Sequence, residues 1–406
     1  MQDLRKHIIF FSVIAMMISL FVSRIGLSVS LALFVAACFF HQNIRQHRRI
    51  FFSSPLLWGM TLLFLLPLLS VLWSEDKQAW LRIMRIKLPL LLLPLAIASP
   101  FSFSKKQWRL LCFILIGLVT AGTIWSMFHY LGNMPAVHEE YLRAGAMVTA
   151  LGNDHVRFSW LIATTFLLGS WLAWSYKDQK KIFWILFLVL AWLVIFLHIL
   201  ASRTGVISFY AVVLAMVGWF VFKKAKPLHG LGLTVGLIAL PLAAYFLLPT
   251  FRNKIKFFNY DLGYFREAHY LPGGNDASRV ISLKAGWDLM SDHAVQGVGF
   301  GDITAETQKW YDNHYPEVLP VDRILPSSEW LIYGAGCGLV GFLVFTLVLL
   351  TPFFISVKNR YRWWLLSSVV VFGFLFDIGL EVQFGVFIYS FIVLFAWKFF
   401  HEETGI

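Results

Sequence analysis

Long runs of apolar residues alternate with short polar turns along most of the chain. Many of these runs are about twenty residues long, which is the length that an α-helix needs to cross the hydrocarbon core of a membrane. The pattern predicts twelve spans, roughly at residues 8–22, 26–40, 55–73, 86–99, 109–131, 157–176, 181–200, 204–222, 229–248, 331–352, 363–380 and 383–400. We therefore expect an all-α polytopic membrane protein in which residues 1–406 form a single transmembrane domain.

One long polar segment, residues 249–330, interrupts this pattern between the ninth and tenth predicted spans. From residue 251 to residue 329 it carries eight Lys and Arg residues, eleven Asp and Glu residues and three histidines. A Pro-Gly-Gly-Asn-Asp turn signal at residues 272–276 precedes a helical pattern at residues 278–290. The segment is therefore expected to be a large loop that contains short helices.

The composition excludes the soluble fold classes, because 59% of the residues are hydrophobic and only 14% are charged, against about a quarter charged in soluble domains. The first apolar run begins within ten residues of Met1 and no small-residue cleavage site follows it, so we expect a retained helix. Cys38, Cys112 and Cys337 lie in or at the edge of apolar runs and lack metal-ligand spacing. A disulfide framework is therefore not expected.

The charge of the turns predicts the orientation in the membrane. With Met1 in the cytoplasm, the cytoplasmic turns and both termini carry 18 Lys and Arg residues and 4 Asp and Glu residues, a net charge of +14. The other side carries the remaining 16 basic and 18 acidic residues, a net charge of −2, and the two values sum to +12. By the positive-inside rule both termini are cytoplasmic and the long loop lies outside. The basic excess then reflects insertion and anionic lipid headgroups, and it does not indicate nucleic acid.

Arg203 lies in a turn that is too short to project into solvent, at the outer end of the seventh predicted span. A charge at that depth is costly, and such residues usually face a cavity or a partner. The alternative is an arginine that reaches up to the outer headgroups. The small neighbours Ser202, Thr204 and Gly205 favour a ligand site, because they leave room and add donors beside a guanidinium suited to phosphate.

Arg279 lies in the first turn of the helix predicted at residues 278–290, where a cation opposes the helix dipole. Such a cation normally has another partner, so Arg279 and the nearby Lys284 are candidates for binding the same anion as Arg203. A salt bridge within the loop explains the spacing equally well.

His314 is the candidate general base of the long loop. It lies among polar and aromatic neighbours, and Asp312 or Glu317 is placed to orient it. A neutral imidazole, with an unperturbed pKa near about 6.5, is the usual general base around neutrality. The alternative is an ordinary surface histidine. His293, in a turn before the glycine-rich run, is a weaker candidate.

The glycine-rich run at residues 297–302 predicts a tight turn and not a phosphate cradle, because it lacks the strand and helix context of a dinucleotide site. Outer carboxylates such as Glu329 and Glu381 have no recognisable ligand spacing, so no metal site is predicted. Glu381 lies with Gln383 in the turn before the last span, where it is either a partner for an outer arginine or part of a plain turn.

The order of the short motifs is more specific than any one of them. An arginine turn follows the seventh span, and the long loop carries further motifs that continue into the tenth span. They read Ser202-Arg203-Thr204-Gly205, Ser278-Arg279, Asp292-His293, Gly297-Val298-Gly299-Phe300-Gly301, Ser328-Glu329-Trp330-Leu331 and Gly336-Cys337-Gly338-Leu339-Val340-Gly341-Phe342. In this order, and in its full topology, the chain resembles the O-antigen ligase and polymerase family of bacterial envelope proteins.

The resemblance implies an inverting glycosyltransferase of the bacterial inner membrane. Its donor is a polysaccharide on undecaprenyl pyrophosphate at the periplasmic face. The acceptor is the lipid A–core oligosaccharide in ligases, which is the function that we predict here, or another lipid-linked repeat unit in polymerases. The matching arginines, Arg203 and Arg279, bind the pyrophosphate, and a loop histidine activates the acceptor hydroxyl. The family is described as needing neither a metal nor a nucleotide, so no cofactor is expected.

The chain departs from the family where a His-Asn pair usually precedes the tenth span, because it has Ser327-Ser328 there. Three explanations are open: His314 reaches the same point, a carboxylate such as Glu329 is the base, or this substrate does not need the histidine. We predict His314.

Four further residues are predicted to bind the substrate: Lys284, Arg323, Glu329 and Glu381. A transporter for a lipid-linked sugar is the alternative from another functional class. Transporters usually show broken helices and charges near the midplane of the membrane. The predicted spans are nearly free of charge and the polar residues gather on one face, which favours chemistry at the membrane surface.

Overall fold

The computed structural model of the protein describes residues 2–224, 227–266, 270, 272–274 and 276–401. All regular secondary structure within these residues is helical, and the all-α prediction is confirmed in this part of the chain. Long apolar runs form helices because a helix satisfies every backbone hydrogen bond within one segment, without help from water.

Seven of the described helices are long and apolar enough to cross a membrane. They are α1 (Gln2–Val22), α4 (Pro55–Leu69, continued by the short helix η1, Ser70–Leu72), α7 (Lys105–Gly132), α9 (His155–Ser175), α10 (Lys180–Leu200), α16 (Glu329–Phe354) and α18 (Gln383–His401). The count reaches nine if two bent pairs are each one span. These pairs are α2 (Arg24–Phe39) with α3 (Ile44–Ser53), bent by 114°, and α12 (Pro227–Leu247) with α13 (Pro249–Arg266), bent by 94°.

The remaining helices lie outside these two sets. They are α5 (Lys77–Lys87), α6 (Pro89–Ile97), α8 (Met134–Glu140), α11 (Arg203–Lys224), α14 (Asp276–Asp292), α15 (Ile303–His314), α17 (Arg360–Leu375), η2 (Pro320–Asp322) and η3 (Gly379–Glu381). Every predicted span falls largely on one helix. However, the 9 residues of α6 extend only about 14 Å at 1.5 Å per residue, which is too short to cross a membrane alone. Twelve crossings therefore stay a prediction.

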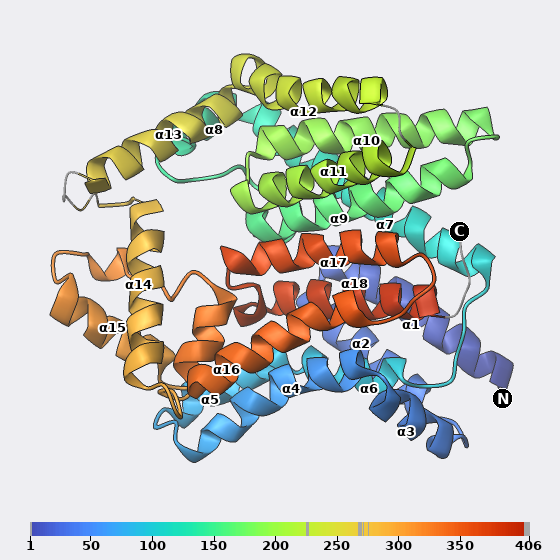
Figure 1. The fold of residues 1–406 in the computed structure, drawn as a ribbon, viewed down its shortest axis with the longest axis horizontal. Coiled ribbons are helices and arrows are strands. Elements are labelled where there is room, and N and C mark those ends of the chain that lie inside the picture. The colour runs from blue at the N-terminus through green and yellow to red at the C-terminus, as the bar shows by residue number, and fades with distance from the viewer. Residues whose placement is uncertain (1, 225–226, 267–269, 271, 275, 402–406) are drawn as a thin grey trace.

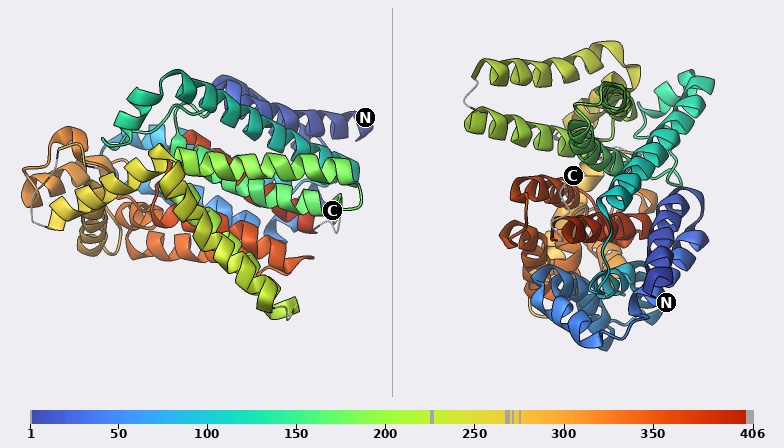
Figure 2. Two further views of the ribbon diagram at one scale, coloured as in Figure 1. Left: turned by 90° about the horizontal axis from the view of Figure 1, so that it is seen from above. Right: turned by 90° about the vertical axis from the view of Figure 1, so that its right-hand side faces the viewer.

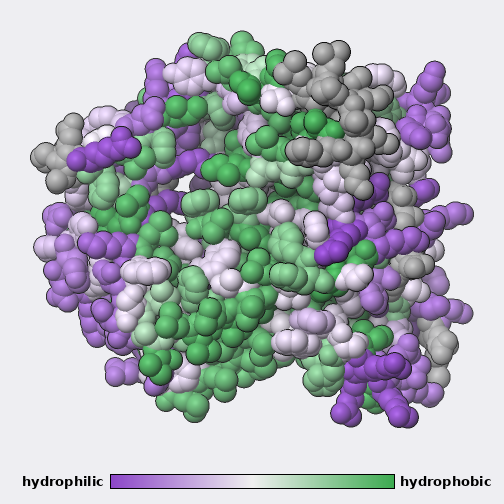
Figure 3. Space-filling model, viewed as in Figure 1, coloured by the Kyte–Doolittle hydropathy of each residue, from purple (hydrophilic) through white to green (hydrophobic). Residues whose placement is uncertain are grey.

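Most of the long helices run along the longest axis of the molecule (Figure 1), and both ends of the chain lie at one end of this bundle (Figures 1 and 2). α13, α14 and α15 lie at the opposite end, which we call the loop end. Hydrophobic residues cover the middle of the face shown in Figure 3, and hydrophilic residues gather at the two ends. This distribution is the one that a membrane-spanning bundle requires, and it supports the prediction of a multi-pass membrane protein.

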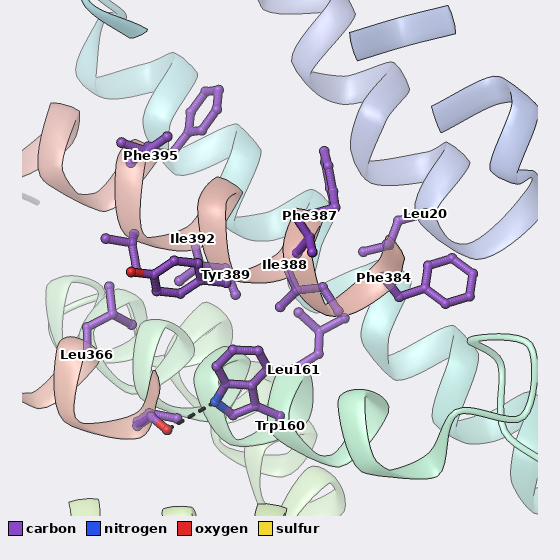
Figure 4. Packing of buried hydrophobic residues seen from close by; sticks show 14 of the residues in the cluster. Leu20, Trp160, Leu161, Leu366, Phe384, Phe387, Ile388, Tyr389, Ile392 and Phe395 are labelled. Atoms are coloured by element: carbon purple, nitrogen blue, oxygen red, sulfur yellow. Dashed lines mark hydrogen bonds between the residues drawn. The ribbon is translucent and has the colours of Figure 1, made fainter. Parts of the chain in front are cut away.

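The centre of the bundle is built around α18, the candidate span with the largest buried share, 83%. Figure 4 shows Tyr389 of α18 close to Trp160 of α9 and Leu366 of α17. The Trp160 Nε1–H donates a hydrogen bond of 3.0 Å to the Val369 carbonyl, so the one polar atom of this large side chain has a partner. The contact holds α9 against α17. The N-terminal end of α9 and the C-terminal end of α17 both lie at the candidate site.

α16 is broken at Cys337 and Gly338, where the backbone leaves the helical region. The run at residues 294–299 fills the break: the Val298 amide donates to the Ala335 carbonyl at 2.8 Å, and the Leu339 amide donates to the Ala294 carbonyl at 2.8 Å. Protein backbone therefore satisfies the groups that the break exposes. The break serves packing, and the described contacts show no substrate passage there.

The glycine-rich run at residues 297–302 packs between this break and the turn before α5. A Cβ on Gly299 would lie 2.4 Å from Ser74 Oγ, and a Cβ on Gly301 would lie 2.4 Å from the Asp76 carbonyl oxygen. Asp302 then accepts hydrogen bonds from the amides of Glu75 and Asp76, at 2.7 and 2.9 Å. The glycines allow close backbone packing, which agrees with a tight turn and leaves no space for a phosphate.

Candidate active site

Asp154 starts α9 at the loop end. Its carboxylate accepts a hydrogen bond of 3.1 Å from the Arg157 amide, as an N-cap should. This cap puts His155 and Arg157 into the first helical turn. The Arg157 guanidinium, 11% exposed, lies 3.0 Å from a carboxylate oxygen of Asp377 and donates to the Ile378 carbonyl at 2.9 Å. Arg157 thereby ties the start of α9 to the turn after α17.

Arg203 is the first residue of α11 because α10 ends sharply at Ala201, which adopts the left-handed conformation at φ 47°. The Arg203 guanidinium forms an ion pair with Asp276 at the start of α14. It also lies over the Phe258 ring, 5.3 Å from the ring centroid. The Arg203 side chain is 33% exposed, so part of the guanidinium fork faces outward while Asp276 and Phe258 hold its orientation.

Two small neighbours of Arg203 serve helix packing. A Cβ on Gly205 would lie 2.4 Å from the Ser159 Cβ, so Gly205 permits the close approach of α11 to α9. The hydroxyl oxygens of Ser202 and Ser159 lie 3.0 Å apart across the same contact. These two residues therefore do not line the open space that the sequence suggested for them, and the functional interpretation depends on Arg203 itself.

Arg279 and Lys254 lie next to Arg203. Arg279 donates a hydrogen bond of 2.9 Å from Nη1 to the Phe376 carbonyl. The buried Lys254 donates to the carbonyls of Ala144 and Gly145, at 3.3 and 3.1 Å. Burial lowers the pKa of Lys254, and the positive charges of Arg203 and Arg279 lower it further. Burial lowers the pKa of Arg279, while the Asp377 carboxylate counteracts that shift.

We call Arg157, Arg203, Lys254 and Arg279 the basic cluster. Its members come from four elements, α9, α11, α13 and α14, that meet at the loop end. Its acidic neighbours hold these cations in place: Asp276 binds Arg203, and Asp377 binds Arg157. Burial raises the pKa of Asp377, and the charges of Arg157 and Arg279 oppose that rise.

The start of α14 is fixed by a carboxylate from α13. The Asp276 amide donates a hydrogen bond of 2.6 Å to Asp261 Oδ2, which satisfies one of the free amides at a helix N-terminus. Arg279 follows in the first turn, where the helix dipole disfavours a cation, and the Phe376 carbonyl and the negative charge of Asp377 favour it there. This arrangement explains how a cation is accommodated at Arg279, in the first turn of the helix.

The basic cluster has the chemistry of an anion site. Guanidinium forks bind phosphate oxygens in pairs, and a bound carboxylate uses only part of the five donors of an arginine. The cavity beneath the cluster, lined by Arg157, Thr204 and Asp377 among others, holds only about 10 Å³, which is about one water. A ligand must therefore approach from the exposed side of Arg203.

Glu329 and Glu381, predicted to bind substrate, are engaged by a lysine that the sequence did not single out. Lys87 is fully buried, with its Nζ 2.6 Å from Glu381 Oε1 and 3.6 Å from Glu329 Oε1. The Leu380 amide donates to Glu329 Oε2 at 3.0 Å. Glu329 has no exposed side-chain surface, and these contacts hold α5, α16 and η3 together. A substrate contact by Glu329 or Glu381 stays a prediction, and this geometry does not favour it.

His314 lies on the surface of α15, apart from the basic cluster. Its ring stacks on Trp310 at 4.7 Å between centroids, and its Nδ1 lies 3.0 Å from the Trp310 carbonyl oxygen. Asp312, expected to orient His314, instead binds Arg323 at 2.6 Å. Lys284 lies over the Tyr315 ring at 5.6 Å. Among the contacts of the described residues, none joins His314, Lys284 or Arg323 to Arg203 or Arg279.

Ser327 occupies the position where the family usually has histidine, and it has a packing role here. It is buried, and its hydroxyl oxygen lies 2.8 Å from that of Ser282. The Ser327 amide also donates to Ser282 Oγ at 3.2 Å. These hydrogen bonds link the middle of α14 to the start of α16, so Ser327 is not placed to act on a substrate hydroxyl.

Two residues of the site were missed by the sequence analysis: Arg157 and Lys254. The dipole argument applied to Arg279 also applies to Arg157, because Asp154 is an evident N-cap and Arg157 follows in the first turn. Lys254 gave no such signal. Among the described residues, no three His, Cys, Asp or Glu side chains are grouped closely enough to hold a metal ion.

Comparison with known proteins gives one family. Residues 188–346 match the model of the family described as O-antigen ligase. The matched segment contains Arg203, Lys254, Arg279 and Ser327, and it ends within α16. No curated protein matches the chain. Residues 188–346 are thus similar to the O-antigen ligase family, which supports the resemblance that the order of the motifs predicted.

Proposed function

We propose that the protein is an O-antigen ligase, a membrane glycosyltransferase that moves a polysaccharide from undecaprenyl pyrophosphate to the lipid A–core oligosaccharide. The proposed site lies at the loop end, on the periplasmic side of the bacterial inner membrane. The observation that carries the proposal is the basic cluster, three of whose four members lie in the segment that matches the family.

The donor's diphosphate is proposed to bind Arg203 and Arg279. Arg203 is 33% exposed and held by Asp276 and Phe258, so its fork needs little reorganisation when an anion arrives. Arg279 and Lys254 add positive charge from the two adjacent helices. Prearranged donors of this kind stabilise the charge that grows on a leaving group, an effect usually worth several kcal/mol.

In the proposed reaction, a hydroxyl of the acceptor attacks the anomeric carbon of the donor from the face opposite the diphosphate, and the configuration inverts. The attacking hydroxyl must lose a proton, and the leaving diphosphate gains negative charge. The basic cluster accounts for the second requirement. The base predicted from the sequence, His314, lies elsewhere on α15.

The ligase and polymerase functions use the same donor and differ in the acceptor, and one assay separates them. Purified protein in lipid nanodiscs is given undecaprenyl-pyrophosphate-linked polysaccharide with either lipid A–core or a lipid-linked repeat unit. We expect gel analysis to show polysaccharide on lipid A–core. Elongated lipid-linked product would instead mark a polymerase, and no product with either acceptor would contradict the assignment.

A further inference from the structure

A cavity lies in the half of the bundle nearest both termini, away from the loop end. It is bounded by side chains of α1, α7, α9, α17 and α18 and has a volume of about 80 Å³. Figure 4 shows two of these side chains, Leu366 of α17 and Phe395 of α18. The walls are almost entirely apolar but include the charged Arg362. Leu168 and Ala396, which also line the cavity, remain partly exposed, so the cavity is not enclosed.

The apolar walls indicate what kind of group fits this cavity. A buried water needs two or more polar partners, and apolar walls do not supply them. Engineered apolar cavities of about 150 Å³ stay dry and bind small hydrocarbons such as benzene. A cavity of about 80 Å³ therefore has room for several methylene groups. In a membrane, the molecules that offer such groups are lipids, and part of an acyl chain fits this space.

Arg362 supplies a positive charge at one end of the cavity. It lies in the first turn of α17, whereas Leu366 lines the cavity one turn further into the bundle. The partly buried Arg362 guanidinium lies over the Trp171 ring, 5.7 Å from the ring centroid. Within the described residues, no carboxylate forms an ion pair with it and no oxygen accepts a hydrogen bond from it. A guanidinium in this setting is prepared for an anionic ligand.

Trp108 of α7 adds a hydrogen-bond donor to the same cavity. Its side chain lines the cavity and is only 5% exposed, and its ring packs edge-on against Phe399, with 5.3 Å between the centroids. The indole Nε1 is buried and has no hydrogen-bond partner among the described residues. Buried indole N–H groups usually have such a partner. The donor is therefore available to an acceptor that a ligand brings into the cavity.

We propose that this cavity binds an anionic glycerophospholipid of the cytoplasmic leaflet. One acyl chain enters the cavity, an ester carbonyl accepts the Trp108 indole N–H, and the phosphate binds Arg362. A glycerophospholipid carries these three groups within one molecule, with the ester between the chain and the phosphate. Basic pockets between membrane helices bind lipid headgroups in this way. The inference does not depend on the proposed function, because it concerns the other end of the bundle.

Arg109, next to Trp108 on α7, favours an anionic headgroup over a zwitterionic one. The Arg109 guanidinium lies over the Tyr176 ring, 5.3 Å from its centroid, and its Nε is buried without a partner among the described residues. Asp178, the carboxylate of the turn after α9, forms no ion pair with Arg109 or Arg362 within the described structure. A zwitterionic headgroup carries a cation that these arginines repel. The charge of the turns predicts that this end is cytoplasmic, where anionic lipids attract basic residues.

The test measures how tightly the purified protein binds phosphatidylglycerol and phosphatidylcholine with the same acyl chains, by native mass spectrometry. We expect the wild type to bind one phosphatidylglycerol about tenfold or more tightly than phosphatidylcholine. Arg362→Gln should weaken phosphatidylglycerol binding by about tenfold, as loss of a charge-assisted hydrogen bond does, and Trp108→Phe by about fivefold. Ala396→Phe fills the cavity and keeps every charge, and it should also weaken binding by about tenfold.

Arg360→Gln is the matched control, because Arg360 is exposed, begins the same helix and does not line the cavity. It should bind phosphatidylglycerol as the wild type does. Circular dichroism identifies any variant that does not fold, and the remaining cavity variants then carry the test. Equal binding of the two lipids by the wild type would overturn the inference. Wild-type binding by Ala396→Phe would also overturn it, as would an Arg360→Gln variant weakened as much as Arg362→Gln.

Discussion

Replacing Arg203 with alanine is expected to reduce polysaccharide transfer by about 100- to 1,000-fold, as loss of one prearranged donor does at other sites where charge develops. The variant removes a partly exposed fork of the basic cluster and leaves Asp276 without its cation. Lys254 and Arg279 remain, but neither takes the position over the Phe258 ring. The rate of the nanodisc assay and the surface polysaccharide of cells that carry the variant both measure the effect.

Two controls make the Arg203 result specific. Arg266 lies exposed at the end of α13, and Arg266→Ala removes the same charge from the same end of the molecule without touching the cluster, so transfer should be unchanged. Arg203→Lys keeps the charge but not the planar fork, and its rate should fall between the wild type and the alanine variant. Normal surface polysaccharide in cells with Arg203→Ala would contradict the proposed role.

Replacing Lys87 with methionine is expected to destabilise the fold by about 3–5 kcal/mol, the usual cost of removing one partner from a buried ion pair. Lys87 is the cation that faces two carboxylates, Glu329 and Glu381, of which Glu329 is fully buried. Without it, both would be left as uncompensated charges near the junction of α5, α16 and η3. The midpoint of unfolding in detergent should fall clearly.

A matched comparison isolates this buried charge. Lys309 also binds a glutamate, Glu306, at 2.6 Å, but its side chain is 68% exposed, and exposed pairs contribute little. Lys309→Met should leave the unfolding midpoint unchanged. Combining Lys87→Met with Glu329→Gln and Glu381→Gln should restore much of the stability, because no uncompensated charge then remains. A triple variant as unstable as Lys87→Met would show that the lysine acts through packing.

The helices of the bundle were predictable because each predicted span is an almost continuous apolar run. In a membrane such a run satisfies its backbone hydrogen bonds by forming a helix. The spans at 181–200 and 204–222 match α10 and α11 closely. The span at 86–99 was harder to predict, because this region is divided between two helices, and the second of them, α6, begins only at Pro89. The number of crossings depends on such short and bent elements, so the apolar pattern alone does not determine it.

The site was predictable only in part, because its geometry depends on contacts far apart in the chain. Arg203 and Arg279 each gave a local signal, a charge at unusual depth and a cation against a helix dipole. Lys87 pairs with a carboxylate 294 positions away, and no local pattern reports such a contact. The His314 prediction followed the order of the loop motifs, and a role for His314 stays a prediction.

The central claim is that Arg203 and Arg279 bind the diphosphate of the donor. Its most direct test compares the binding of undecaprenyl pyrophosphate with that of undecaprenyl phosphate, a lipid with the same tail and one phosphate fewer. We expect the wild-type protein to prefer the pyrophosphate, and the double variant Arg203→Ala/Arg279→Ala to lose about tenfold or more of its affinity for the pyrophosphate, with little change for the monophosphate. A double variant that keeps the wild-type preference would contradict the claim.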